Sequence, residues 1–238
     1  DNMLVKLIAR SFITPRGQSQ MGDLGYERNS ALIADALAEF AGRNCYRSFD
    51  RPNPATTENE DYLRHILEVG HESVLEHASA TFYIEASRSV LTELERHRHL
   101  SFSVVSQRYV NPKPLGVQIP PAINVLGDAD MNDALDVLAD ASKHAGAAYE
   151  RLFGIFTNAG LPRKQAREAA RAVLPNMTNS PMVVTGNHRA WRYVIKARWH
   201  EAADAEIREL AGELLKQLRE IAPNSYQDIP EYPYSYGG

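Results

Sequence analysis

The stretch ASATFYI at residues 78–84 is the clearest strand signal in this chain, and it decides the expected fold class. Its apolar side chains alternate with Ser79, Thr81 and Tyr83, so one face is apolar and the other is polar. A period of two residues is typical of a β-strand that buries one face. We therefore expect a strand here, and with it a sheet.

Shorter apolar runs predict two more strands, at residues 4–8 and 182–185. Because these runs lie far from residues 78–84 in the sequence, some of the strand pairing must be non-local. Apolar residues at helical spacing predict that helices surround the strands. The longest such patterns cover residues 135–156, 162–173 and 207–221.

Polar residues predict where several helices begin. Ser30, Ser87 and Asn187 each precede a helical pattern, and their side-chain oxygens can accept a hydrogen bond from a free backbone N–H group. Residues 57–60 and 73–76 match the capping-box pattern, in which a carboxylate follows a hydroxyl after three residues.

The whole pattern predicts a single α+β domain over residues 1–238, with a central, mostly antiparallel sheet flanked by helices. The chain contains neither G-x-G-x-x-G nor G-x-x-x-x-G-K-[ST], so no Rossmann motif and no P-loop are expected. Residues 11–28 are polar and contain proline and glycine, which predicts a loop. The tail 224–238 is rich in tyrosine, proline and glycine, and we expect it to be flexible.

Positive charge is concentrated in three segments of an acidic chain. The formal net charge is −4, yet residues 88–108, 163–171 and 189–198 hold 12 of the 26 lysines and arginines. These segments contain only three acidic residues, so they sum to +9 and leave −13 for the rest. Such a distribution favours one anion-binding pocket over a broad surface for nucleic acid.

Other features limit the class of protein. No apolar run approaches the roughly 20 residues of a membrane helix, so no membrane partner is expected. Cys45 is the only cysteine, which fits a reducing cytoplasm, and we expect its side chain to be a small buried apolar group. His71 and His77 match no zinc-binding spacing, so no metal site is expected.

The strongest chemical signal is RHRHLSFSVVSQRY at residues 96–109. Guanidinium groups form a planar fork of donors that suits phosphate oxygens, and serine hydroxyls can complete a phosphate site. The histidines and Tyr109 can stack on, or hydrogen-bond to, a planar ring. The segment can therefore hold a nucleotide, and a solvated basic helix end is the alternative interpretation.

Two later segments carry further arginines. Arg171 ends one predicted helix, and Arg198 shares a face of another helix with Trp191 and Val194. For Trp191 the pattern favours core packing. On a partly apolar face, Arg198 either reaches out to water or pairs with an anion, and a structural ion pair stays as open as a role in a site.

Residues 96–109 resemble the R-H-R-x7-S-x-R-Y signature of the flavin-dependent thymidylate synthases (the ThyX family). Residues 70–77, 167–175 and 186–191 resemble other segments of that family. The resemblance extends over residues 40–222. It implies a homotetramer with active sites between subunits, which binds FAD without a Rossmann motif.

The resemblance also implies a reaction and a set of site residues. dUMP is methylated to dTMP, with 5,10-methylenetetrahydrofolate as carbon donor and NADPH as reductant, and neither nucleic acid nor a membrane is a partner. The residues implied to contact FAD are Ser73, Arg96, His97, Arg98, Asn187, His188 and Arg189. Those implied to line the dUMP site are Glu93, Arg96, Ser106, Gln107, Arg108, Arg171 and Arg198, of which Arg198 is the catalytic residue.

The chemistry also follows from the residue types. Uracil C5 is a poor nucleophile, so negative charge must build on the ring before C5 attacks a one-carbon unit. Arg198 cannot act as a base, because arginine side chains are not deprotonated in proteins, but its charge can stabilise that anionic ring. Reduced flavin is expected to supply the hydride. Ser106 is expected to bind substrate and not to act as a nucleophile, because no carboxylate is evident to orient a neighbouring histidine.

Two positions depart from the family pattern. Val104 stands where many members carry Gln or Glu, which puts one polar contact near the substrate in doubt. Tyr193 stands where others have His or Asn near the flavin, so no role is carried over to it. Position 93 holds Glu, where some members have Gln.

Three other functions compete with this one. A non-catalytic nucleic-acid-binding or nucleotide-binding module would use the same basic segments, but its binding would weaken steeply with salt and need no flavin. A phosphoryl-transfer enzyme or hydrolase would need a carboxylate cluster for magnesium near the arginines, which the sequence lacks. The cysteine-dependent thymidylate synthase needs a nucleophilic thiol, and nothing around Cys45 resembles that site.

Overall fold

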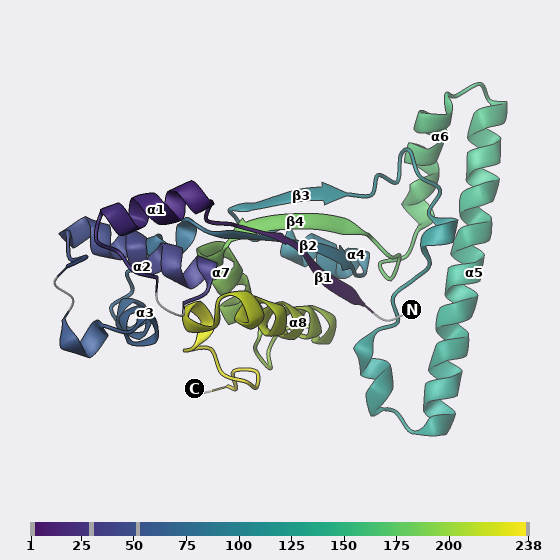
Figure 1. The fold of residues 1–238 in the computed structure, drawn as a ribbon. Helices are drawn as coiled ribbons and strands as arrows, with labels where there is room; N and C mark the ends of the chain where they lie inside the picture. Colours follow the sequence, from purple (N-terminus) through teal and green to yellow (C-terminus); the bar gives the residue numbers. More distant parts are fainter. Residues whose placement is uncertain (1–2, 29–30, 51–52, 237–238) are drawn as a thin grey trace. The chain divides into compact units, whose positions relative to one another are not determined.

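The computed structural model describes residues 3–28, 31–50 and 53–236, which form an α+β fold. One antiparallel sheet has the strand order β1-β2-β4-β3 (Figure 1). Its strands are β1 (Leu4–Arg10), β2 (Ser79–Glu85), β3 (Leu100–Val104) and β4 (Met182–Asn187). The predicted fold class, with an antiparallel sheet and flanking helices, is confirmed.

The chain forms two compact units, which are described one at a time. The first consists of Asp1–Leu4, Tyr83–Arg96 and Phe102–Val183, and the second of Val5–Phe82, His97–Ser101 and Val184–Gly238. The helices of the described residues are α1 (Pro15–Asp23), α2 (Ile33–Tyr46), α3 (Asn59–Glu68), α4 (Arg88–Leu94), α5 (Asp128–Asn158), α6 (Arg163–Ala170), α7 (His188–Arg198) and α8 (Ala205–Ile221). The single domain over residues 1–238 stays a prediction.

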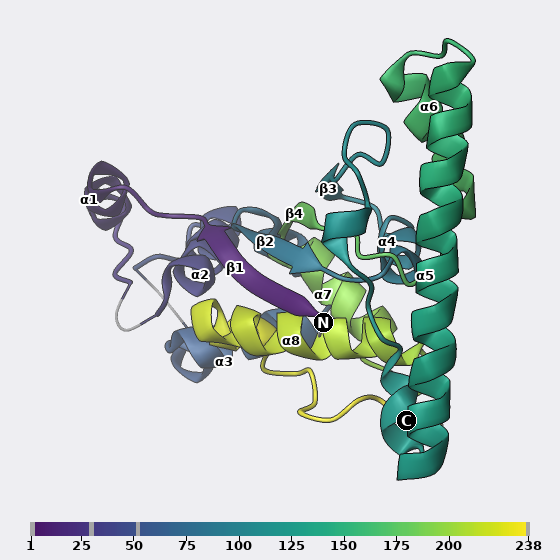
Figure 2. The ribbon, with the colours of Figure 1, turned by 90° about the vertical axis from the view of Figure 1, so that its right-hand side faces the viewer.

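The core of the second unit packs α7 and α8 against strand residues. Phe82 of β2 meets the ring of Trp191 edge-on at 5.1 Å, and the Trp191 Nε1 donates to the Ala80 carbonyl at 3.0 Å. α8 lies beside α7 (Figure 2) and buries its predicted apolar stripe, including Leu210, Leu214 and Leu218. The expectation that Trp191 packs in the core is therefore confirmed.

Helix α1 corrects the prediction of a loop over residues 11–28. Thr14 caps this helix, because its Oγ1 accepts a hydrogen bond from the Gly17 N–H at 3.0 Å. Pro15 occupies the first turn, where its missing N–H group costs nothing. Proline and glycine suggested a loop, but here the proline starts a helix.

The capping predictions have a mixed outcome. Ser87 caps α4 and Asn187 caps α7, as predicted, since their side chains accept from Val90 N–H and Ala190 N–H respectively. Ser30 lies outside the described residues.

Both predicted capping boxes are wrong. α3 begins after Glu58 without a side-chain cap, and the Thr57 hydroxyl donates instead to the Asn53 carbonyl at 3.3 Å. Ser73 lies inside a 3₁₀ turn, Glu72–Glu76, that follows His71 and has no side-chain cap. Local hydrogen bonds to the preceding loop compete with the capping geometry.

The C-terminal segment packs more closely than its composition suggests. Ser225, Tyr226 and Ile229 are all buried. The Asp35 carboxylate of α2 accepts hydrogen bonds from the Ser225 hydroxyl at 2.6 Å and from its N–H at 3.0 Å. The expected flexibility therefore does not describe residues 225–229, because a buried polar contact holds them against α2.

Cys45 is exposed, so the expectation of a buried apolar thiol is wrong. It lies in the last turn of α2, where residues 44–47 are all exposed. The part of α2 that is covered ends at Arg43, which is buried and paired with Glu39 at 2.7 Å.

The first unit contains α5 and α6, which pack against each other. α5 follows the predicted helical stripe, but only Tyr149 on it is buried.

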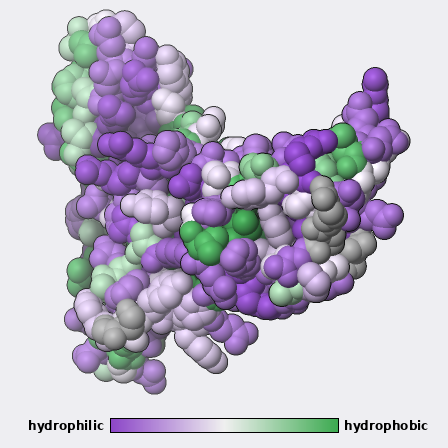
Figure 3. Space-filling view, turned by 90° about the vertical axis from the view of Figure 1, so that its left-hand side faces the viewer, coloured by the Kyte–Doolittle hydropathy of each residue, from purple (hydrophilic) through white to green (hydrophobic). Residues whose placement is uncertain are grey.

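No helix in the described ranges is long and apolar enough to cross a membrane. The face of the molecule in Figure 3 is largely hydrophilic, with small separate hydrophobic patches.

Candidate active site

A hydrogen bond joins two of the predicted site residues in the second unit. Arg198, the last residue of α7, donates from Nε to the Nε2 atom of His97 at 3.0 Å. To accept this bond, His97 must be neutral, with its proton on Nδ1. Burial, together with the Arg198 charge, lowers the pKa of His97 and favours this neutral form. His97 therefore helps to fix the position of the Arg198 guanidinium.

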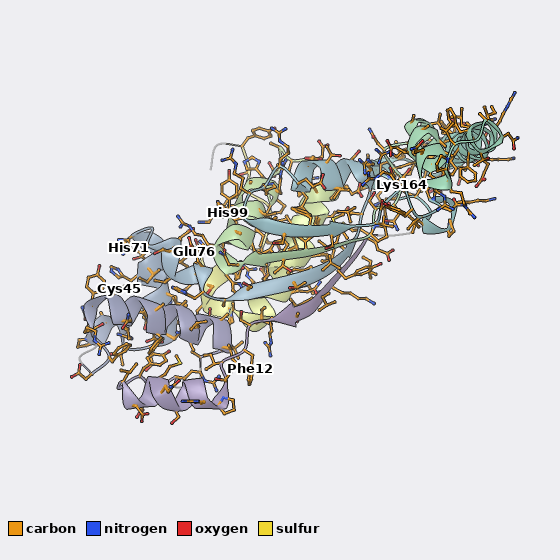
Figure 4. The ribbon with its side chains drawn as sticks, turned by 90° about the horizontal axis from the view of Figure 1, so that it is seen from above. Phe12, Cys45, His71, Glu76, His99 and Lys164 are labelled. Atoms are coloured by element: carbon orange, nitrogen blue, oxygen red, sulfur yellow. The ribbon has the colours of Figure 1, made fainter. Side chains whose placement is uncertain are left out.

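The segment around His97 presents alternate side chains to opposite environments. His97 is 7% exposed, whereas Arg96 and Arg98 are exposed on either side of it. His99 takes a left-handed conformation at φ 66°, which turns the chain into β3 (Figure 4). Within the described parts of the chain neither Arg96 nor Arg98 forms an ion pair, so both guanidinium groups can meet an anion.

In the first turn of α7, two of the predicted site side chains form hydrogen bonds within the fold. Asn187 Oδ1 accepts from the Ala190 N–H at 2.8 Å. The His188 ring is buried, and its Nδ1 lies 2.8 Å from the Tyr226 hydroxyl. These two side chains are engaged and the His188 N–H donates to the Ala78 carbonyl at 3.1 Å, so the side chain that this turn exposes to a ligand is that of Arg189.

Burial sets the protonation state of His188. It lowers the pKa of the ring to about 4, because no nearby charge compensates the lost hydration of an imidazolium. Arg189, by contrast, lies at the surface in an ion pair with Glu76 of the 3₁₀ turn (Figure 4 labels Glu76). An exposed pair of this kind is weak and can exchange for an anionic ligand.

Tyr193 and Ser73 are the remaining positions of interest in the second unit. Tyr193 is exposed and meets the ring of His97 edge-on at 5.7 Å. Tyr193, which departs from the family pattern, therefore contacts a predicted site residue. Ser73 is exposed in the 3₁₀ turn.

Other predicted residues lie in the first unit, in the turn after β3. The Ser106 carbonyl accepts from the Tyr109 N–H at 3.1 Å and the Val110 N–H at 2.9 Å. This turn buries Gln107 and leaves Arg108 exposed. Three predicted residues lie elsewhere in this unit: Glu93 is half-buried, and Arg96 and Arg171 are exposed.

Sequence reasoning missed a group of cations next to this turn. Arg163, Lys164 and Arg167 of α6 line a surface hollow together with Arg108 and Tyr109. The sequence marks the segment 163–171 as basic but assigns only Arg171 of it to a site. The signal that could have found the others is their spacing of three and four residues, which puts Arg163, Lys164 and Arg167 on adjoining faces of one helix.

The residue types present fit a flavin dinucleotide. Exposed arginines without carboxylate partners suit a pyrophosphate, and buried neutral histidines add no competing charge. Among the described residues, no group of three His, Cys, Asp or Glu side chains is placed to hold a metal ion.

Comparisons with known proteins show the family to which the chain belongs. The family model described as "Thymidylate synthase complementing protein" matches residues 30–224. A "Probable flavin-dependent thymidylate synthase" of Mycobacterium phage D29 is 71% identical over 239 residues, which cover 99% of this chain and 100% of that protein. The "Flavin-dependent thymidylate synthase" of Mycobacterium tuberculosis (strain ATCC 25618 / H37Rv) is 54% identical over 199 residues, 82% of this chain and 79% of that protein.

A solved structure shares the fold. The UMP/dUMP methylase PolB from Streptomyces cacaoi, bound with 5-Br dUMP, superposes with a TM-score of 0.69 at 21% identity, covering 98% of this chain and 96% of that one. At this identity the likeness speaks for the fold alone. The fold and the exposed arginines of each unit define a class of α+β proteins that can hold anions without a Rossmann motif. Within that class, this chain belongs to the flavin-dependent thymidylate synthase family.

Proposed function

We propose that this protein methylates dUMP to dTMP, with 5,10-methylenetetrahydrofolate as carbon donor, FAD as hydride carrier and NADPH as reductant. The names of its phage and mycobacterial relatives support the synthase activity. The structural observation that carries the proposal is the hydrogen bond from Arg198 to His97, which ties the end of α7 to the arginine–histidine motif.

Arg198 is the proposed catalytic residue. A guanidinium group serves as a fixed cation and not as a base. Placed beside the uracil ring, it stabilises the negative charge that must develop there before C5 can attack. His97 positions Arg198 without taking its charge, because the neutral ring accepts one N–H of the guanidinium.

The proposed flavin contacts are divided between side chains and backbone. Arg96, Arg98 and Arg189 offer exposed guanidinium groups, and His97 adds its buried ring. Asn187 and His188 are proposed to lie at the flavin, with both side chains hydrogen-bonded within the fold. Ser73 offers an exposed hydroxyl. When bound, FAD supplies the hydride that reduces the transferred carbon.

The proposed dUMP contacts follow the same reasoning. Arg96, Arg108 and Arg171 are exposed cations suited to the phosphate, and Ser106 and Gln107 lie in the adjoining turn. The partly buried carboxylate of Glu93 is proposed to face the nucleotide as a hydrogen-bond acceptor. Ser106 is proposed to bind substrate and not to act as a nucleophile.

The wider setting is also a proposal. We expect a single-domain homotetramer with active sites at the subunit interfaces, working in the cytoplasm without nucleic-acid or membrane partners and without a metal. The departures at Val104 and Tyr193 are expected to change contacts around the nucleotide and the flavin, and not the reaction.

The proposal is tested first by the visible absorption spectrum of the purified protein after addition of FAD and desalting. We expect retained flavin bands that bleach with NADPH, and faster bleaching when dUMP is present. A protein that stays colourless would contradict the proposed function. Salt-dependent nucleic-acid binding would then be the property to measure.

The role of Arg198 is tested by dTMP formation in Arg198→Ala, with Lys216→Ala as a matched control at an exposed position of α8. Loss of a fixed charge at the reacting ring is expected to lower the rate by about 100-fold to 1000-fold. FAD retention should be unchanged. Turnover close to that of Lys216→Ala would remove Arg198 from the mechanism.

A further inference from the structure

One surface of the first unit carries more positive charge than the phosphate of dUMP would need. We call it the α6 cation hollow, and it is lined by Arg108, Tyr109, Arg163, Lys164 and Arg167. Four of these five residues carry a positive charge. Lys164 projects from α6 in Figure 4.

Two of the four cations, Lys164 and Arg167, lie against aromatic rings. Lys164 Nζ lies 5.3 Å from the centre of the Tyr109 ring, and the Arg167 guanidinium lies 5.7 Å from that of Phe153. Arg167 also donates a hydrogen bond to the Tyr109 carbonyl. These contacts position the charges of Lys164 and Arg167 without neutralising them.

No carboxylate in the described part of the chain forms an ion pair with any of the four cations. Four like charges around one hollow repel each other, and the repulsion is relieved when an anion enters. A phosphate monoester carries at most two negative charges, so the dUMP phosphate alone would leave half of this charge unpaired.

We propose that the α6 cation hollow binds the polyanionic end of a co-substrate, a group with three or more negative charges. Two co-substrates of the proposed function carry such a group: NADPH has its phosphates, and folate has carboxylates when it bears a γ-linked glutamate chain. The proposal rests on the proposed function for these two sources. The chemistry of the hollow, an oligoanion site, is independent of it.

The anion site itself is tested without turnover, by titrating the intact protein with tripolyphosphate and with tri-γ-glutamate in a calorimeter. The double variant Arg163→Gln/Lys164→Gln removes two cations and leaves Arg108 and Arg167 in place. Lys143→Gln, at an exposed position of α5 in the same unit, is the matched control. We expect affinity for at least one probe to fall about tenfold per removed charge, and the control to bind like the wild type.

Equal affinity of the double variant and the control for both probes would overturn the proposal. This outcome is distinct from failure of the proposed function, because probe binding needs neither flavin nor turnover. A flavin-free, inactive protein can still pass this test.

Steady-state kinetics then identify the source of the anion. A raised KM for NADPH in the double variant, with the KM for folate unchanged, assigns the hollow to the reductant. A raised KM for pentaglutamyl folate but not for monoglutamyl folate assigns it to the glutamate chain. A change in the KM for dUMP alone would overturn the proposal, because it would place the two cations in the phosphate site of the substrate.

Discussion

Lowering the pH should protonate His188 and lower the free energy of unfolding. The burial of the His188 ring determines the size of this effect. The ring is buried, its Nδ1 lies 2.8 Å from the Tyr226 hydroxyl, and its Nε2 has no hydrogen-bond partner among the described residues. Protonation would place a charge in this apolar position. Burial therefore lowers the pKa of His188 from 6.5 to about 4.

The size and sign of the effect follow from proton linkage. The unfolded chain takes up the proton near pH 6.5 and the folded protein only near pH 4, so the free energy of unfolding falls as the pH drops through this window. The contribution of neutral His188 to the free energy of unfolding is fully present above pH 6.5 and is lost as the pH falls towards 4. The complete loss is about 3 kcal/mol, and about 2 kcal/mol of it is expected between pH 7 and pH 5.

The assay is urea unfolding, followed by the fluorescence of the buried Trp191, at pH 7, 6 and 5. His188→Asn keeps an amide near the position of Nδ1 but cannot titrate. His144→Asn, at an exposed position of α5, is the control. We expect the wild type and the control to lose about 2 kcal/mol more than His188→Asn over this range. An identical pH dependence in all three proteins would refute the reasoning.

Two further predictions concern the stability of α7, measured by the same urea titration at pH 7. Asn187→Ala should lower the free energy of unfolding by about 1 kcal/mol, because it removes the side chain that caps the Ala190 N–H. Asn187→Asp keeps a capping oxygen and should leave the free energy of unfolding unchanged. Equal losses in the two variants would exclude the cap as the cause. Arg192→Met should lower the free energy of unfolding by about 3 kcal/mol, because the fully buried guanidinium pairs with Asp228 at 2.7 Å and with Glu72 at 3.2 Å. A loss below about 1 kcal/mol would show that burial of the apolar methionine side chain offsets the lost ion pairs.

Features coded by local spacing could be predicted from the sequence. The alternation in residues 78–84 became β2, with Ala80, Phe82 and Ile84 buried. The apolar stripe of α8 is buried, and Ser87 and Asn187 cap their helices. In each case neighbouring residues supply the whole signal, because a strand face, a helix face or a cap is set within a few positions.

Where local signals compete, prediction was less successful. Pro15 is compatible with both a loop and the first turn of a helix, and the Thr14 cap favours the helix. Thr57 had the spacing of a capping residue, but its hydroxyl reached back to the Asn53 carbonyl. Cys45 could not be placed from its residue type, because exposure depends on where the covering elements end.

The sequence motif alone identified the family and most of the charged residues now proposed for the site. Only the tertiary structure decided which of them meet. His97 and Arg198 are 101 positions apart, and His188 and Tyr226 are 38 apart. The α6 cation hollow likewise joins Arg108 to residues 163–167. Such contacts depend on how strands and helices pack, which no local spacing encodes, and this packing sets which histidines are neutral and which cations stay unpaired.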